Sequence, residues 1–125
     1  MKYLLDTHVL IWWFVNDPTL SNEARQIIAN GTNLIYVSSA SAWEIVIKKA
    51  LGKLKAPNNF EHELLRHKFA SLPISISHAL MVENLPNYHQ DPFDRILVSQ
   101  ATVEKMSLIT RDEKVKRYDI TVVAA

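Results

Sequence analysis

The alternation of apolar and polar positions predicts short strands separated by helices. Apolar runs of strand length occur at residues 3–5, 34–37, 74–76, 108–109 and 120–123. Helical segments are predicted between them at residues 9–15, 21–29, 40–51, 57–69, 77–85 and 91–105, with a short one from residue 113. Such alternation favours an α/β fold with a mostly parallel sheet covered on both faces. Ligands of such sheets bind beyond the carboxyl ends of the strands.

The helix boundaries are marked by capping and terminating residues. Ser21 is expected to cap the second helix, and Asp91-Pro92 supplies a cap and a first helical position for the longest one. Gly52 is expected to end the helix over residues 40–51, and Asn30-Gly31 to end its helix in a left-handed conformation.

Length and composition limit the class of protein. The chain has 125 residues and no linker or low-complexity segment, so we expect one domain over residues 1–125. Apolar residues make up 48% and glycines number two, which excludes a disordered chain and a turn-rich β-sandwich. The absence of cysteine excludes a disulfide framework and a thiolate metal site. The longest uninterrupted apolar run, Val9–Val15, is too short for a secretory or membrane segment, so we expect a cytoplasmic protein with no membrane partner.

Four acidic residues occur where such a fold gathers side chains at one edge of its sheet: Asp6, Glu44, Asp94 and Asp112. Gathered carboxylates repel one another by about 4 kcal/mol per pair at about 4 Å and an effective dielectric constant near 20. A domain with about 5–15 kcal/mol of net stability tolerates such a cluster when a divalent cation compensates it. An all-oxygen site suits Mg²⁺ first and Mn²⁺ second, because Zn²⁺ prefers Cys or His ligands.

Each acid also has a structural explanation. Asp91 and Asp112 are suitable N-caps, Asp94 would favour a helix dipole, and Glu44 forms a capping-box pattern with Ser41. For Asp94 and Glu44, however, the position lies on the apolar stripe of the predicted helix, where a carboxylate needs a partner. We therefore give Asp94 the metal role and Asp91 a capping or outer role at the helix entrance.

The basic and aromatic residues leave several interpretations open. Basic residues gather at 48–55, 66–68 and 114–117, as expected around a phosphate-bearing partner or on an ordinary solvated surface. Arg95 is placed to contact phosphate, to pair with an acid, or to lie on a solvated face. The five histidines form no ligand-spaced pair, and pocket lining is the favoured role for His8 and His89. The run Trp12-Trp13-Phe14 favours core packing for one or two rings and a partner surface for the rest.

Four segments resemble the successive motifs of PIN-domain nucleases, in particular those of VapC toxins from toxin–antitoxin pairs: Leu4–His8, Ser41–Ile45, His89–Arg95 and Ile109–Asp112. The resemblance extends from Met1 to about Val123. It implies a Rossmann-like α/β/α sandwich, a divalent-cation-dependent endoribonuclease, a homodimer and a small antitoxin partner. By position, the acids at 6, 44, 94 and 112 match the acidic quartet of the family, and Thr110 matches a small hydroxyl residue beside the last acid.

The chemistry that we expect is hydrolysis of RNA. One or two ions held by Asp6, Asp94 and Asp112 lower the pKa of a bound water, and Glu44 orients or deprotonates that water for in-line attack on a phosphodiester. The resemblance implies products with a 3′-hydroxyl and a 5′-phosphate. A receiver-like Mg²⁺-binding domain fits poorly, since only Asp6 follows the first strand. A non-catalytic, metal-stabilised module that binds RNA or protein remains the alternative.

Overall fold

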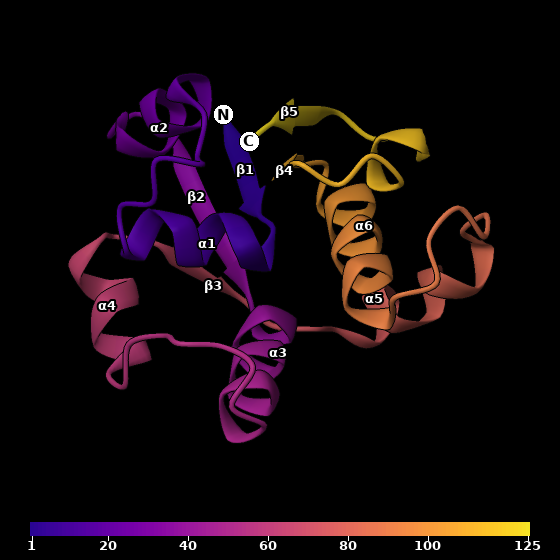
Figure 1. Cartoon of the computed structure of the whole chain (residues 1–125). Coiled ribbons are helices and arrows are strands. Elements are labelled where there is room, and N and C mark those ends of the chain that lie inside the picture. Colours follow the sequence, from indigo (N-terminus) through magenta and orange to yellow (C-terminus); the bar gives the residue numbers. More distant parts are fainter.

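Five parallel strands form a single sheet in the computed structural model, which describes all residues 1–125 (Figure 1). The strands are β1 (Lys2–Leu5), β2 (Leu34–Ser38), β3 (Ala70–Leu72), β4 (Ser107–Thr110) and β5 (Val122–Ala124). Their order across the sheet is β3-β2-β1-β4-β5, and every neighbouring pair is parallel. The expected α/β class with a parallel sheet is confirmed.

Helices cover both faces of this sheet. They are α1 (Thr7–Phe14), α2 (Asn22–Ala29), α3 (Ser39–Ala50), α4 (Phe60–Arg66), α5 (Ile76–Met81) and α6 (Pro92–Glu104), with 3₁₀ turns η1 (Val82–Asn84) and η2 (Val115–Arg117). Because side chains alternate along a strand, Leu5 packs in a core with α1 and α2, whereas Leu4 packs in a second core with α6 and η2. The two cores give the α/β/α sandwich that the sequence predicts.

The third strand lies at residues 70–72, so the prediction of a strand at 74–76 is wrong. Helix α4 ends at Arg66, Lys68 adopts a left-handed conformation with φ of 59°, and Phe69 enters the core. Ile74 and Ile76 remain 40% and 78% exposed. Their apolar character therefore marks a surface and the start of α5 rather than a buried strand.

The end of α2 also differs from the prediction. Asn30 is extended, with φ of −77° and ψ of 110°, and Gly31 does not have positive φ. Instead of a left-handed turn, the Asn30 side chain accepts hydrogen bonds from the backbone N–H and the hydroxyl of Thr32. Gly52, with φ of 70°, does follow α3 in the left-handed region.

The carboxyl edge of the sheet positions the acidic residues. Asp6 directly follows β1, and its backbone N–H donates to the carbonyl of Ile109 in β4 at 3.0 Å. Asp112 lies two residues beyond the end of β4. No helix in the chain has the length and apolar character needed to span a membrane.

Candidate metal centre and active site

Asp6 serves both as a helix cap and as a site residue. Its Oδ1 accepts from the backbone N–H of His8 at 2.8 Å, which caps α1. Its Oδ2 accepts from the hydroxyl of Thr110 at 2.7 Å. The Thr110 oxygen also accepts from the backbone N–H of Asp112 at 3.1 Å. The fully buried Thr110 therefore fixes the positions of two of the predicted acids.

Asp112 has a similar double role. Its Oδ1 accepts from the backbone N–H groups of Lys114 and Val115 at 2.8 and 3.2 Å. Its Oδ2 lies 2.9 Å from Nε2 of His89. Burial acts to raise the pKa of this carboxyl, but the hydrogen bonds from His89 and from the two backbone groups outweigh it, so the pKa lies below its usual range. Asp112 is thus held ionised.

The start of α6 separates the roles of Asp91 and Asp94. Oδ1 of Asp91 accepts from the backbone N–H groups of Phe93 and Asp94 at 2.8 and 3.3 Å, so Asp91 is the predicted N-cap. Asp94 points into the acidic cluster. Burial raises the pKa of Asp94 to about 7, and repulsion from Asp6, Asp91 and Asp112 adds to this effect, while His89 opposes it. Its negative charge is therefore the least compensated in the cluster.

A cavity of about 330 Å³ brings together Asp6, Asp94 and Asp112. Its wall is completed by His8, Val9, Trp12 and Arg111. Three carboxylates that face one space and repel one another supply the oxygen donors that a divalent cation requires. The donor set thus fits Mg²⁺ or Mn²⁺.

Glu44 does not line this cavity, although the sequence groups it with the other three acids. It is buried on α3, where its Oε2 lies 2.5 Å from Nζ of Lys48 one turn later. This hydrogen bond raises the pKa of Lys48, and the charges of Asp91 and Asp94 act in the same direction. The Glu44–Lys48 pair therefore lies beside the cluster.

The capping box predicted for Ser41 and Glu44 is wrong. The hydroxyl of Ser38 caps α3 by accepting from the backbone N–H of Ala40 at 3.0 Å. Because the helix begins at Ser39, Ser41 already lies inside it, where its oxygen accepts from the hydroxyl of Thr7 at 2.9 Å.

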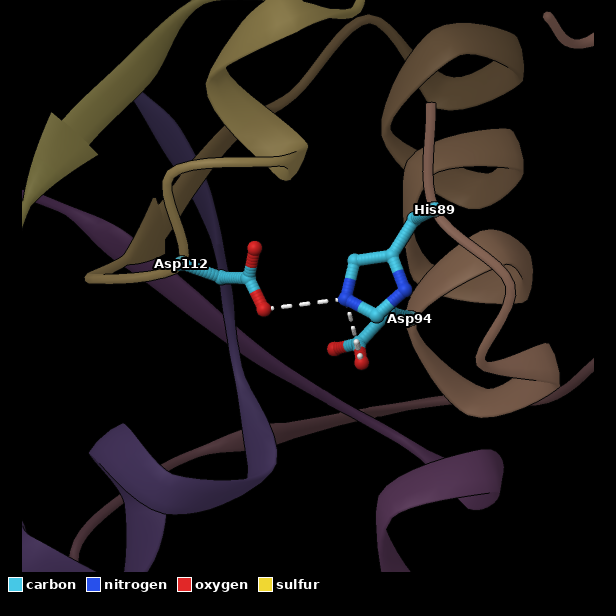
Figure 2. A group of neighbouring side chains, drawn as sticks. All are labelled: His89, Asp94 and Asp112. Carbon is cyan, nitrogen blue, oxygen red and sulfur yellow. Dashed lines mark hydrogen bonds and ion pairs between the residues drawn. The ribbon is translucent and has the colours of Figure 1, made fainter. Parts of the chain in front are cut away.

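Two neighbours of the acids are His89, for which the sequence favours pocket lining, and Lys48, which the sequence places only in a group of basic residues. The loop before α6 places Nε2 of His89 between Oδ2 of Asp94, at 3.2 Å, and Oδ2 of Asp112, at 2.9 Å (Figure 2). One ligand-type atom from each of these three residues lies within 4.8 Å of the others. The spacing of Glu44 and Lys48 by four residues was a readable signal for their pair. No comparable local signal linked His89 to Asp112.

Comparison with known proteins decides the family. Residues 3–120 match the model of the PIN domain.

The chain belongs to the PIN-domain family.

Individual relatives agree with this assignment and with the expected resemblance to VapC proteins. Ribonuclease VapC16 of Mycobacterium tuberculosis (strain ATCC 25618 / H37Rv) is 39% identical over 61 residues, which span 46% of this chain and 43% of that protein. The chain thus matches less than half the length of this relative.

Solved structures show the same fold. VapBC2 from Rickettsia felis, bound to a DNA fragment from its promoter, superposes with a TM-score of 0.73 at 18% identity, covering 98% of each chain. DNA-bound VapBC from Salmonella typhimurium superposes with a TM-score of 0.71 at 18% identity, and the match covers 98% of this chain and 97% of that one.

In this PIN domain, Arg95 anchors a loop instead of pairing with an acid or lying on a solvated face. Its guanidinium donates to the backbone carbonyls of Pro86 and His89 at 3.0 and 3.3 Å and to the hydroxyl of Tyr118 at 3.2 Å. Further bonds reach the carbonyls of Val82 and Leu85. These groups occupy both terminal nitrogens of Arg95, so the structure gives no support to its predicted contact with phosphate.

The aromatic run divides between the core and the site. Trp13 and Phe14 pack against His67 and Phe69, which confirms core packing for two of the three rings. Trp12 also packs against this core, but it forms part of the cavity wall as well, with the guanidinium of Arg111 4.8 Å from its ring centre. Trp12 is therefore the one aromatic residue of the run that faces the acidic cavity.

Proposed function

We propose that this PIN domain is a divalent-metal-dependent endoribonuclease that acts as the toxin of a toxin–antitoxin pair. The observation that carries the proposal is the convergence of Asp6, Asp94 and Asp112 on one cavity at the carboxyl edge of the sheet. The name of the relative Ribonuclease VapC16 supports RNA as the substrate class. Membership of the PIN-domain family removes the receiver-like alternative.

Asp6, Asp94 and Asp112 would hold the cation, with Mg²⁺ preferred and Mn²⁺ accepted. When bound, the cation lowers the pKa of the attacking water and neutralises charge on the scissile phosphate. The backbone and hydroxyl hydrogen bonds to Asp6 and Asp112 fix both carboxylates before any ligand arrives. Such preorganisation limits the cost of reorganisation during the reaction.

Glu44 is the proposed general base. It orients the water and takes its proton as the water oxygen attacks phosphorus in line with the bond to the 3′ oxygen. That bond breaks and the departing 3′ oxygen takes up a proton from solvent, leaving a 5′-phosphate on one fragment and a 3′-hydroxyl on the other. Lys48 holds the Glu44 carboxylate in place through the 2.5 Å ion pair.

The direct test is a cleavage assay on unstructured RNA and on total cellular RNA. We expect endonucleolytic cuts with Mg²⁺ or Mn²⁺, none after chelation, and full recovery when the cation is restored. Fragment ends should be a 3′-hydroxyl and a 5′-phosphate, which ligation assays distinguish. Cleavage that persists in chelator would refute the metal role, whereas cation binding without cleavage of any RNA would favour the non-catalytic binding module.

We also propose a homodimer and an antitoxin partner. The names of the structural relatives, which are VapBC complexes, support the partner. Exposed apolar side chains on α3 and α5 support a dimer, since Trp43, Val46, Ile76 and Leu80 are each more than 60% exposed.

Expression with and without the product of the adjacent open reading frame tests both assemblies. We expect growth arrest by the chain alone, rescue by co-expression, and a purified chain of twice the 14.3 kDa monomer mass. A harmless chain that is active in vitro would contradict the toxin role, and a monomer at micromolar concentration would contradict the dimer.

A further inference from the structure

His89 has the position of a metal ligand but not the hydrogen bonding of one. By distance alone, His89, Asp94 and Asp112 form a group able to surround a cation (Figure 2). An imidazole in that group would give a mixed nitrogen and oxygen site, which favours transition metals such as Mn²⁺ and Zn²⁺ over Mg²⁺. Whether His89 is a ligand therefore decides which metal the site prefers.

The second ring nitrogen settles which atom carries the proton. Nδ1 of His89 lies 3.0 Å from the backbone nitrogen of Asp91, whose N–H can only donate. Nδ1 is therefore the acceptor, and the proton of the ring lies on Nε2. An Nε2–H group has no free lone pair for a metal, but it donates to Oδ2 of Asp112 at 2.9 Å. Oδ2 of Asp94 lies 3.2 Å from the same nitrogen, a close contact without hydrogen-bond geometry.

The surrounding loop opposes rotation of the ring. The backbone N–H of His89 donates to the hydroxyl of Tyr118 at 3.0 Å, and the His89 carbonyl accepts from Arg95. Arg95 also donates to the Tyr118 hydroxyl, which links the loop to both α6 and η2. The His89 side chain is only 11% exposed. A ring turned to present a nitrogen lone pair to the cluster would lose the bond from Asp91.

We infer that His89 is a positioning residue, which donates Nε2–H to the carboxylate of Asp112 beside that of Asp94 and is not itself a metal ligand. This inference rests on the proposed metal site. In this role, His89 helps to set the distance between two carboxylates that otherwise repel each other. The cation would then be bound by oxygen donors only. The site should therefore lack the preference for transition metals that an imidazole ligand would give.

Metal titrations of three proteins test the inference. The Gln side chain can place an amide N–H near the position of Nε2 but offers no nitrogen lone pair, so His89→Gln should bind Mg²⁺ and Mn²⁺ within about 3-fold of the wild type. His89→Ala should weaken both ions together by about 10–100-fold, the usual effect of losing a group that orients metal ligands. A selective loss of Mn²⁺ affinity in His89→Gln, with Mg²⁺ affinity retained, would overturn the inference.

A measurement on the wild type avoids dependence on the folding of any variant. Nitrogen-15 NMR of the ring should show the proton on Nε2, both in the metal-free protein and after Mg²⁺ addition. A proton on Nδ1 in the Mg²⁺-bound protein would make His89 a ligand and refute the positioning role. Neither readout uses RNA. If the protein bound Mg²⁺ with the ring proton on Nε2 but cut no RNA, only the proposed nuclease function would be overturned.

Discussion

Asp94→Asn should reduce kcat/KM for RNA cleavage by about 10³-fold or more while leaving the fold intact. A neutral amide oxygen is a poor ligand for a divalent cation, and the lost charge is the one least compensated in the cluster. The start of α6 should persist, because its cap is Asp91. Cleavage rates measured at saturating Mg²⁺, with circular dichroism of the same samples, check both statements.

Asp91→Asn is the matched control. It removes a negative charge three residues earlier in the same helix entrance, yet asparagine caps helices as well as aspartate does. We expect this variant to retain activity within about 10-fold of the wild type. If Asp91→Asn were inactive and Asp94→Asn active, the assignment of the metal ligand would have to be exchanged between them.

The same Asp94→Asn substitution should stabilise the metal-free protein, so its effects on activity and on stability have opposite signs. In the unfolded chain the carboxyl titrates near its usual value of 3.8, whereas in the folded protein it titrates at about 7. Between these values the unfolded state releases the proton that the folded state retains, so the free energy of unfolding falls as pH rises through that window. Above pH 7 the full destabilisation is present.

The size of this effect follows from the pKa difference. Moving the pKa from 3.8 to about 7 corresponds to about 4 kcal/mol before screening. The Asp94 side chain is 22% exposed to water, which reduces the expected gain to about 1–2 kcal/mol. Denaturant unfolding in chelator should show Asp94→Asn to be more stable at pH 8 and equal to the wild type near pH 4. Excess Mg²⁺ should reverse the order at pH 8, because only the wild type binds it tightly.

Glu44→Gln should lower the cleavage rate by about 10²–10⁴-fold, the usual contribution of a general base. Glutamine retains an oxygen that accepts from Lys48, so the helix and the fold should be unaffected. Single-turnover rates separate this loss from an effect on RNA binding. A fully active Glu44→Gln enzyme would return Glu44 to a structural role.

Lys48→Met tests whether activity requires only the Glu44 carboxylate or the whole ion pair between Glu44 and Lys48. The substitution removes the 2.5 Å contact but leaves the Glu44 carboxylate in the protein. We expect activity within about 10-fold of the wild type. If both variants were equally inactive, the pair as a whole, and not proton transfer to Glu44, would be required.

The sequence predicted the elements that carry strong periodic or capping signals. Helix α6 was located from Asp91-Pro92 at its start, and Lys105 ends it with φ of 57°. The strand at 70–72 was misplaced because the nearby apolar residues Ile74 and Ile76 are exposed, and a sequence pattern does not report which apolar residues a partner element will cover.

Three of the four predicted acids, Asp6, Asp94 and Asp112, line one cavity, whereas the hydrogen-bond partners of these acids do not follow from the sequence. The hydrogen bond from Thr110 to Asp6 joins residues 104 positions apart and depends on the register of β1 with β4. His89 meets Asp112 from the loop before α6, whose backbone is held by hydrogen bonds with Arg95 and Tyr118. The expectation of an uncompensated cluster was therefore too strong, since His89 and Lys48 each supply hydrogen-bond donors to its members.

The hydrogen bonds that Asp6 and Asp112 accept from backbone N–H groups have an evolutionary consequence. Each carboxylate keeps one oxygen on backbone N–H groups, a role that asparagine or serine performs nearly as well. One such replacement would therefore silence the proposed nuclease while preserving the start of α1, the turn after β4 and the exposed surfaces. Descendants of such a chain could persist as folded decoys that still occupy the proposed partner of an active copy, so neutralisation of the proposed toxin and loss of its chemistry can evolve independently.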